Sequence, residues 1–302
     1  MKYFIIFSFA FLLFLFLPTA HAQYVIQQTE YSIPITNNMW PQDKGFKSST
    51  EEAEYFLNLP DNKLMGDKKS GGNEKKESNS TIYLRGNNFA VDSYSPKGEK
   101  SSTIVNADKG MVYLVMWPRK TVMEMSSKDM EEMQKNAEAA GKEMQKKLSP
   151  EMQKQMNEEE AEKKSQPGPE VKYTGKEKNI NGFNCKQYLV EQGDNVMMIW
   201  AADDNEGVSK NIGNATQKMK SLFPSSGEEE KDEWELLPGK IPIVLKTYNS
   251  SMDGSHIEIQ EITKISKENP PAGKFTPPGK AQGFTTRSMK DMMKGMMNSG
   301  DN

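Results

Sequence analysis

Short strand-like segments separated by turn sequences are the feature that most limits the fold of this chain. Between residues 81 and 125, five runs rich in Val, Ile, Tyr and Thr alternate with turns that contain Gly, Asn or Pro. Strands that follow one another this closely pair as hairpins, so the segment predicts an antiparallel meander. The five predicted strands are Thr81–Arg85, Asn88–Tyr94, Ser101–Asn106, Met111–Met116 and Thr121–Met125.

A second group of strands flanks this meander in the sequence. Asn181-Gly182 and Asp253-Gly254 are dipeptides that can supply the positive φ of a tight hairpin turn. The order of strands, helices, strands, helix and strands indicates an α+β fold built around one antiparallel sheet. The predicted strands of this group are Tyr24–Ile33, Val171–Ile180, Phe183–Gln192, Val196–Ala201, Ile241–Tyr248 and Ser255–Ile265.

Three segments have the character of helices that pack against a sheet. They are a short helix near Ser49–Leu57, a long helical region at residues 126–164 and a helix from Val208 to Leu222. The long region begins with Ser126-Ser127-Lys128-Asp129, which has the spacing of a capping box, and we treat the region as a helical insertion. Residues 63–79 are rich in Lys, Gly, Ser and Asn and contain few apolar side chains, so they predict a flexible loop.

The first 22 residues have the three-part layout of a secretory signal peptide. Lys2 precedes an apolar run from Tyr3 to Leu17, and Ala20-His21-Ala22 forms a small-x-small cleavage motif. The run of 15 residues is short for a bilayer of roughly 30 Å. Cleavage is predicted between Ala22 and Gln23, and Gln23 offers no thiol for a lipid anchor. We therefore expect an exported protein with no membrane span after cleavage, in the periplasm of a Gram-negative bacterium or secreted.

Composition argues against several classes of active site. The residues after Ala22 contain one cysteine, Cys185, and one histidine, His256. One cysteine cannot form an internal disulfide, and this pair argues against His/Cys zinc sites and against Ser-His or Cys-His catalysis. The formal net charge of −3 lacks the basic excess of a nucleic-acid-binding domain. Because no phosphate loop or nucleophile elbow is present either, we predict no catalytic residue, no cofactor and no nucleic-acid partner.

One hairpin carries a family resemblance. Thr174-Gly175-Lys176-Glu177 leads into Ile180-Asn181-Gly182-Phe183-Asn184-Cys185, and Tyr188 follows. This segment resembles a hairpin of the bacterial domain-of-unknown-function family 4412 (DUF4412). Trp234–Pro242 resembles the entry to that family's last hairpin, and Phe275–Gly279 resembles its closing segment. The resemblance covers roughly Thr81–Phe284.

The family in turn resembles the periplasmic lipoprotein carriers and their outer-membrane receptors (LolA/LolB-like). This resemblance implies a curved antiparallel sheet, an incomplete β-barrel, whose concave face is covered by helices and can hold an acyl chain. The alternative for the side chains expected on this face is that they are simply core, and the two roles are compatible if the helices lift away from the sheet. The candidate ligand-binding residues are Tyr113, Val115 and Trp117 on one strand and Met198 and Trp200 on another.

Methionine is unusually frequent, with 21 residues in a chain of 302. Met130 and Met133 lie one helical turn apart, and a second set repeats at threes and fours in the C-terminal tail. Thioethers at this spacing could bind Cu(I), which prefers soft ligands. They could equally form an adaptable face for a partner or an acyl chain, or simply the apolar stripe of an amphipathic helix. The tail set is Met289, Met292, Met293, Met296 and Met297.

These observations lead to one hypothesis and two alternatives. We expect an exported, non-enzymatic binding protein that holds a hydrophobic ligand, a lipid or an acylated protein, on the concave face of its sheet. The alternatives are a Cu(I)-handling protein that uses the methionines and a structural or assembly module that binds an envelope protein. The predicted organisation is a signal peptide at residues 1–22, a curved-sheet domain at residues 23–284 and a Met-rich tail at residues 285–302.

Overall fold

The computed structural model describes most of the chain after the predicted cleavage site. The predicted signal peptide, residues 1–22, lies outside the described residues. The described residues are 23–42, 45–60, 63–64, 76–149, 151–153, 168–192, 195–222, 233–251 and 254–291.

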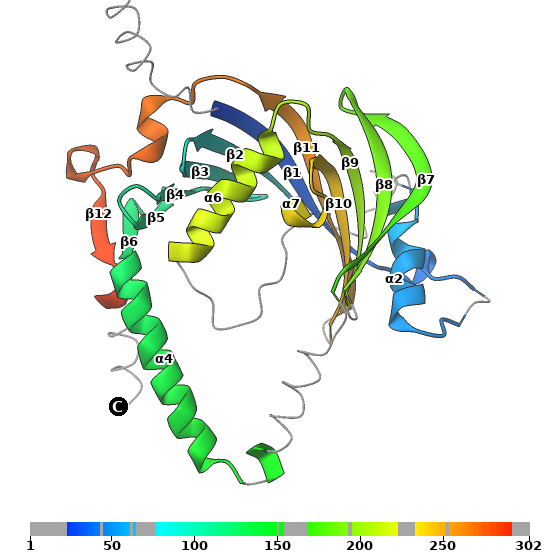
Figure 1. The fold of residues 1–302 in the computed structure, drawn as a ribbon, viewed down its shortest axis with the longest axis horizontal. Helices are drawn as coiled ribbons and strands as arrows, with labels where there is room; N and C mark the ends of the chain where they lie inside the picture. Colours follow the sequence, from blue (N-terminus) through cyan, green and yellow to red (C-terminus); the bar gives the residue numbers. More distant parts are fainter. Residues whose placement is uncertain are drawn as a thin grey trace, which may run out of the picture.

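One sheet of twelve strands organises these residues (Figure 1). In chain order the strands are β1 Gln23–Pro34, β2 Lys76–Arg85, β3 Asn88–Tyr94, β4 Lys100–Asn106, β5 Met111–Met116, β6 Thr121–Ser126, β7 Glu170–Ile180, β8 Phe183–Gln192, β9 Asn195–Asp203, β10 Lys240–Ser251, β11 Gly254–Ser266 and β12 Thr285–Ser288. Their order in the sheet is β12-β6-β5-β4-β3-β2-β1-β11-β10-β9-β8-β7. All neighbours are antiparallel except β12 and β6, which are parallel. The large antiparallel sheet is therefore confirmed, and it is open, with β12 and β7 at its edges.

The first strand joins two meanders. β2 to β6 form one meander and β7 to β11 form the other, and β1 lies between β2 and β11. β1 pairs along ten residues with each of these neighbours. Its residues Tyr24, Val25 and Ile26 are all buried, which fits a strand that is covered on both faces at this end.

Helices lie on both faces of the sheet (Figure 1). The helices α6 Val208–Leu222 and α7 Glu233–Leu236 lie on one face, which we call the α6 face, and α2 Ser49–Leu57 lies on the other, the α2 face. Leu236 packs with Ile199 on the α6 face, whereas Phe56 of α2 stacks on Tyr248 on the α2 face. Because cross-strand partners share a face and successive residues alternate, the strand register assigns each strand residue to one of these faces.

Two segments pack on the α2 face. Phe56 of α2 is fully buried, and its ring centroid lies 4.9 Å from that of Trp40 and 5.5 Å from that of Tyr248. Farther along the sheet, the C-terminal segment places Phe275 and Phe284 against the buried apolar side chains of β3 to β6. The short 3-10 turns of the chain are η1 Asn37–Met39, η2 Ala272–Phe275 and η3 Lys280–Gln282.

The buried carboxylate of Asp92 ties this C-terminal segment to the sheet. It contacts Lys274 of η2, accepts a hydrogen bond from Ser102 Oγ at 2.6 Å, and lies 3.1 Å from Lys100 Nζ. Trp117 Nε1 donates to the same Ser102 Oγ at 2.8 Å. Burial acts to raise the pKa of Asp92, but the hydrogen bonds from Lys274, Ser102 and Lys100 outweigh burial and hold this pKa below its ordinary value. We call Asp92, Lys100, Ser102 and Lys274 the Asp92 cluster.

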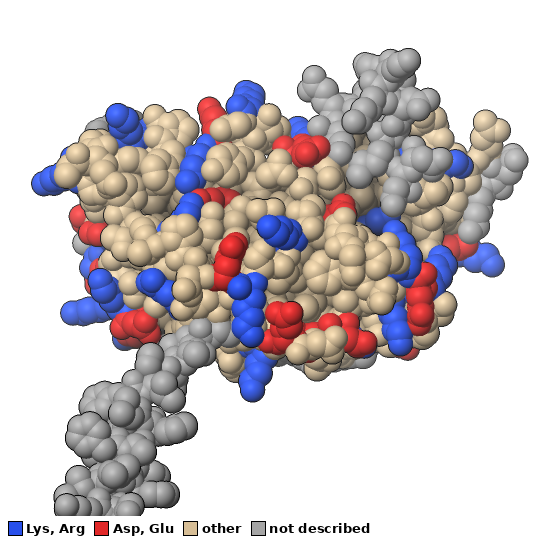
Figure 2. Space-filling view, turned by 90° about the horizontal axis from the view of Figure 1, so that it is seen from above, with Lys and Arg blue, Asp and Glu red and all other residues tan. Residues whose placement is uncertain are grey.

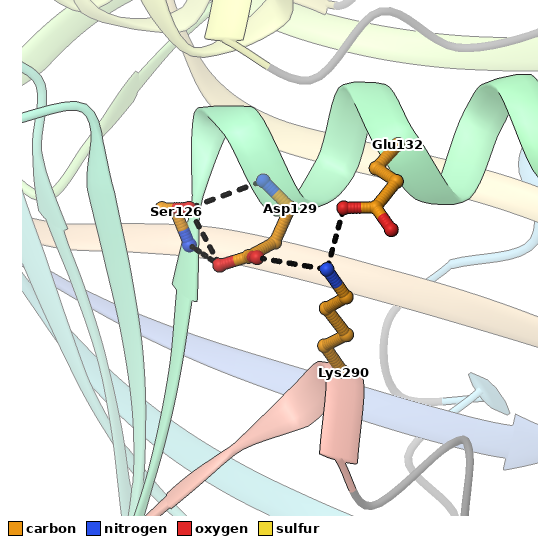
Figure 3. A network of polar contacts seen from close by, with 4 residues as sticks. All are labelled: Ser126, Asp129, Glu132 and Lys290. Carbon is orange, nitrogen blue, oxygen red and sulfur yellow. Dashed lines mark hydrogen bonds and ion pairs between the residues drawn. The ribbon is translucent and has the colours of Figure 1, made fainter.

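The helix α4, Ser127–Lys147, projects from the sheet (Figure 1), and its first turn holds the C-terminal strand (Figure 3). Asp129 N donates to Ser126 Oγ at 3.1 Å, and Ser126 N donates to Asp129 Oδ2 at 3.3 Å. This reciprocal pair is the predicted capping box. Lys290 Nζ, just after β12, lies 2.5 Å from Glu132 Oε2 and 3.8 Å from Asp129 Oδ1, so it joins the end of the sheet to α4.

Three boundaries differ from the predictions. β2 begins at Lys76, inside the predicted loop at residues 63–79, because backbone pairing with β1 orders polar residues without apolar burial. α4 ends at Lys147, and residues 150 and 154–164 of the predicted helical insertion lie outside the described residues. β12 places residues 285–288 in the sheet rather than in the Met-rich tail, since pairing with β6 needs only their backbone groups.

Candidate functional site

Charge and metal ligands do not single out a site. On the face shown in Figure 2, Lys and Arg lie among Asp and Glu, and neither sign forms a large region. Within the described ranges, no group of three or more His, Cys, Asp or Glu is placed to hold a metal ion. No helix in the described part of the chain is long and apolar enough to cross a membrane. The candidate site is therefore defined by shape.

A half-open groove lies on the α6 face, over the strands β2, β1, β11 and β10. Its volume is about 420 Å³. The floor comes from neighbouring strands, and Pro96 of the turn between β3 and β4 adds one wall. The lining residues are Glu30, Tyr31, Ser32, Lys76, Ser78, Pro96, Leu245, Thr247, Glu258, Ile259 and Gln260.

A smaller and more enclosed space, which we call the inner pocket, continues the groove toward α7. Its volume is about 80 Å³, and it shares Leu245 and Gln260 with the groove. Trp234 of α7 forms one side of it. Because two residues line both spaces, the groove and the inner pocket form one continuous site. The lining residues of the inner pocket are Gln28, Ile82, Trp234, Pro242, Leu245, Gln260 and Ile262.

Strand register arranges the side chains of this site in rows that run across β2, β1, β11 and β10. Adjacent rows on one face lie about 7 Å apart, since each is two residues along the strands. The outer row is entirely polar, and apolar side chains appear in the middle and inner rows on the side of β10 and β11. The outer row is Lys76, Ser32, Glu258 and Thr247; the middle row is Ser78, Glu30, Gln260 and Leu245; the inner row is Ser80, Gln28 and Ile262, of which Ser80 lines neither space.

Glu30 is the centre of the hydrogen bonding in the middle row. Its Oε1 accepts from Gln28 Nε2 at 3.2 Å and from Gln260 Nε2 at 3.4 Å, and its Oε2 accepts from Ser78 Oγ at 3.4 Å. These donors come from three neighbouring strands and hold the carboxylate over β1. The site thus combines an oriented carboxylate, several neutral hydrogen-bonding side chains and an apolar end, an arrangement suited to binding an amphipathic molecule.

The candidate ligand-binding residues predicted from the sequence lie elsewhere, in two groups on the α2 face. Tyr113 and Val115 on β5 pack near Phe275 and Phe284, and Trp117 follows β5, with its ring 5.3 Å from that of Phe284. Met198 and Trp200 on β9 are buried in the core that α2 covers. Six strands separate β5 from β9, so the structure does not bring the two groups together. Val115, Met198 and Trp200 are buried, whereas Tyr113 is half-buried and Trp117 is exposed. A ligand-lining role for the five residues stays a prediction.

The other residues that the sequence singled out are also outside the groove. Cys185 is buried on the α2 face, and burial raises the pKa of its thiol to about 11. His256 Nε2 lies 3.4 Å from Glu258 Oε1, at the edge of the groove. Met130 and Met133 are half-buried in the first turns of α4, and Met289 is half-buried after β12. The remaining tail methionines, Met292, Met293, Met296 and Met297, lie outside the described residues.

Sequence reasoning missed the groove because its residues look like ordinary polar strand positions. A usable signal was the set of polar side chains at every second position, Gln28, Glu30 and Ser32, next to the apolar Tyr31 and Ile33. Alternation of this kind predicts one uncovered face. This face of β1 becomes recognisable as part of a site only when Ser78 and Gln260 are known to lie on the neighbouring strands. That knowledge requires the order of the strands in the sheet.

Comparison with known families supports the resemblance described above. Residues 142–280 match the model of DUF4412, a domain of unknown function. This match confirms the family resemblance that the hairpin around Cys185 indicated. A search of curated proteins finds no match.

Similar solved structures are distant. An uncharacterised conserved protein from Thermus thermophilus has a TM-score of 0.37 and 8% identity, with 88% of this chain and 91% of that chain covered. Structures of PNGF-II in two space groups have TM-scores of 0.24 and 0.25 and identities of 12% and 11%, with 91% and 90% of this chain covered. This chain spans about a third of the length of PNGF-II, 33% and 32% in the two structures.

Proposed function

We propose that this protein is an exported, non-enzymatic binding protein that holds a small amphipathic ligand in the groove and inner pocket. The observation that carries the proposal is the continuity between polar rows and an apolar end on one face of the sheet. A polar head group would lie over Glu30 and Gln260, and an apolar chain would enter beside Trp234. The volume of about 420 Å³ falls within the range of roughly 300–1,000 Å³ that is typical of ligand sites.

Sequence features support the remaining parts of the proposal. The signal peptide predicted at residues 1–22 supports a role in the periplasm or outside the cell. The resemblance to lipoprotein carriers supports a lipid or an acylated protein as the ligand, held on the sheet face that helices cover. Helices lie on both faces of the sheet, and α7 contributes Trp234 to the inner pocket on the α6 face, so we place the ligand there.

A variant that fills the groove tests this proposal. Leu245 lines both the groove and the inner pocket, so Leu245→Trp should obstruct the site. The measurement is a fluorescence titration of residues 23–302 with N-phenyl-1-naphthylamine, a neutral apolar fluorophore, together with mass spectrometry of organic extracts of the purified protein. We expect saturable binding by the unmodified protein and a loss of about tenfold or more in affinity for Leu245→Trp, equivalent to about 1.4 kcal/mol.

The control is the same substitution on the other side of the sheet. Leu189 on β8 is partly buried against the core of the α2 face. Leu189→Trp should leave the affinity for the fluorophore within about twofold of the unmodified protein, even if it lowers stability. The proposal fails if the unmodified protein binds neither fluorophore nor extractable lipid, or if the two variants lose affinity equally.

A further inference from the structure

The polar rows of the groove contain more negative than positive charge. Glu30 and Glu258 lie in adjacent rows, and Lys76 at the outer end is the one cation that lines the groove among the described residues. A carboxylate offers about four lone-pair directions, and Glu30 uses three of them for Gln28, Gln260 and Ser78. A cationic group that enters the groove would therefore find a free acceptor direction on Glu30 and a second carboxylate nearby.

We infer that the groove selects amphiphiles whose head group is a cationic amine. The inference rests on the proposed function. The amine binds between Glu30 and Glu258, and the apolar chain enters the inner pocket beside Trp234. An anionic head group would face both carboxylates and binds more weakly.

Ligands with equal chains test the preference for charge. Octylamine, octanol and octanoate are titrated at low ionic strength against residues 23–302 by displacement of N-phenyl-1-naphthylamine. We expect octylamine to bind about fivefold or more tightly than octanoate, a modest ratio because the side chain of Glu258 is 57% exposed. Glu30→Gln should reduce this ratio, because it removes a charge that attracts the amine and repels the carboxylate.

The outcomes separate this inference from the proposed function. If octanoate binds as tightly as octylamine, the selection for an amine is wrong while the groove remains a binding site. The same conclusion follows if Glu30→Gln leaves the ratio unchanged. If none of the three amphiphiles binds, the proposed function fails and the inference fails with it.

Discussion

Replacing Phe56 with alanine is expected to lower the free energy of unfolding by about 3–5 kcal/mol. The ring is 0% exposed and connects α2 to Trp40 and to Tyr248 of β10. It packs edge-on to Trp40 and stacks on Tyr248 with an interplanar angle of 9°. Alanine would leave a cavity between α2 and the sheet that these rings are too constrained to fill. Urea unfolding of residues 23–302, followed by circular dichroism, measures the change.

An exposed aromatic residue provides the control for this variant. Tyr173 on the edge strand β7 is 49% exposed, so Tyr173→Ala should cost less than about 1 kcal/mol. Similar losses for the two variants would contradict the view that α2 is fixed to the sheet by buried aromatic packing. A loss below about 1 kcal/mol for Phe56→Ala would contradict it as well.

Replacing Asp92 with asparagine is expected to lower the free energy of unfolding by about 2–3 kcal/mol at pH 7. The substitution keeps the size of the side chain but removes the charge that partners Lys274 and Lys100. These two lysine side chains are 26% and 23% exposed, so water can partly replace the lost carboxylate, and the cost should stay below that of a fully buried pair. Asp108, whose carboxylate accepts a hydrogen bond at an exposed site, is the matched control, and Asp108→Asn should cost less than about 1 kcal/mol.

At acid pH, the difference in free energy of unfolding between the unmodified protein and Asp92→Asn should become smaller. The pKa of Asp92 in the folded protein is lower than the ordinary value of about 3.9 expected in the unfolded chain. A lowered carboxylate pKa stabilises the fold above the unfolded value, and this contribution is lost as the pH falls through the folded value. Urea unfolding at pH 7, 5, 4 and 3 measures this difference in free energy of unfolding. The difference should have its maximum value at pH 7 and 5 and become smaller below about pH 4. A difference that grows in acid would contradict the ion-paired state of Asp92.

Local elements of this fold can be predicted from the sequence because their signals are local. Asn181 and Gly182 form the predicted hairpin turn with φ values of 52° and 87°, and β7 and β8 pair on either side of it. Ser126 and Asp129 likewise form the predicted cap of α4. Turn and cap chemistry involves residues within a few positions of one another, so the pattern alone is sufficient.

The position of β1 could not be predicted in the same way. Its strand character is visible in Tyr24–Ile33, yet its pairing with both β2 and β11 depends on residues far away in the sequence. The groove depends on that pairing, because Glu30 meets Ser78 on one side and Gln260 on the other only when β1 lies between their strands. The candidate residues chosen from the sequence were selected for apolar character. They include core positions such as Trp200 and one exposed position, Trp117, and none of them lines the groove.

The four tryptophans of the chain can report directly on where a ligand binds. Trp234 lines the inner pocket. Trp200 lies in the core of the α2 face, Trp40 packs on Phe56 of that face and is 38% exposed, and Trp117 lies beside the Asp92 cluster. Each indole N–H gives its own signal in a spectrum of ¹⁵N-labelled protein, and single Trp→Phe variants assign the signals. The four reporters therefore distinguish the groove from the α2 face in one sample.

Titrating octanol into this labelled protein tests the central claim, which is that the groove on the α6 face is the binding site. We expect the indole signal of Trp234 to shift and saturate while the signals of Trp40, Trp117 and Trp200 stay in place. A saturating shift of Trp117 or Trp200 with no change at Trp234 would contradict the claim and would place the ligand on the α2 face instead.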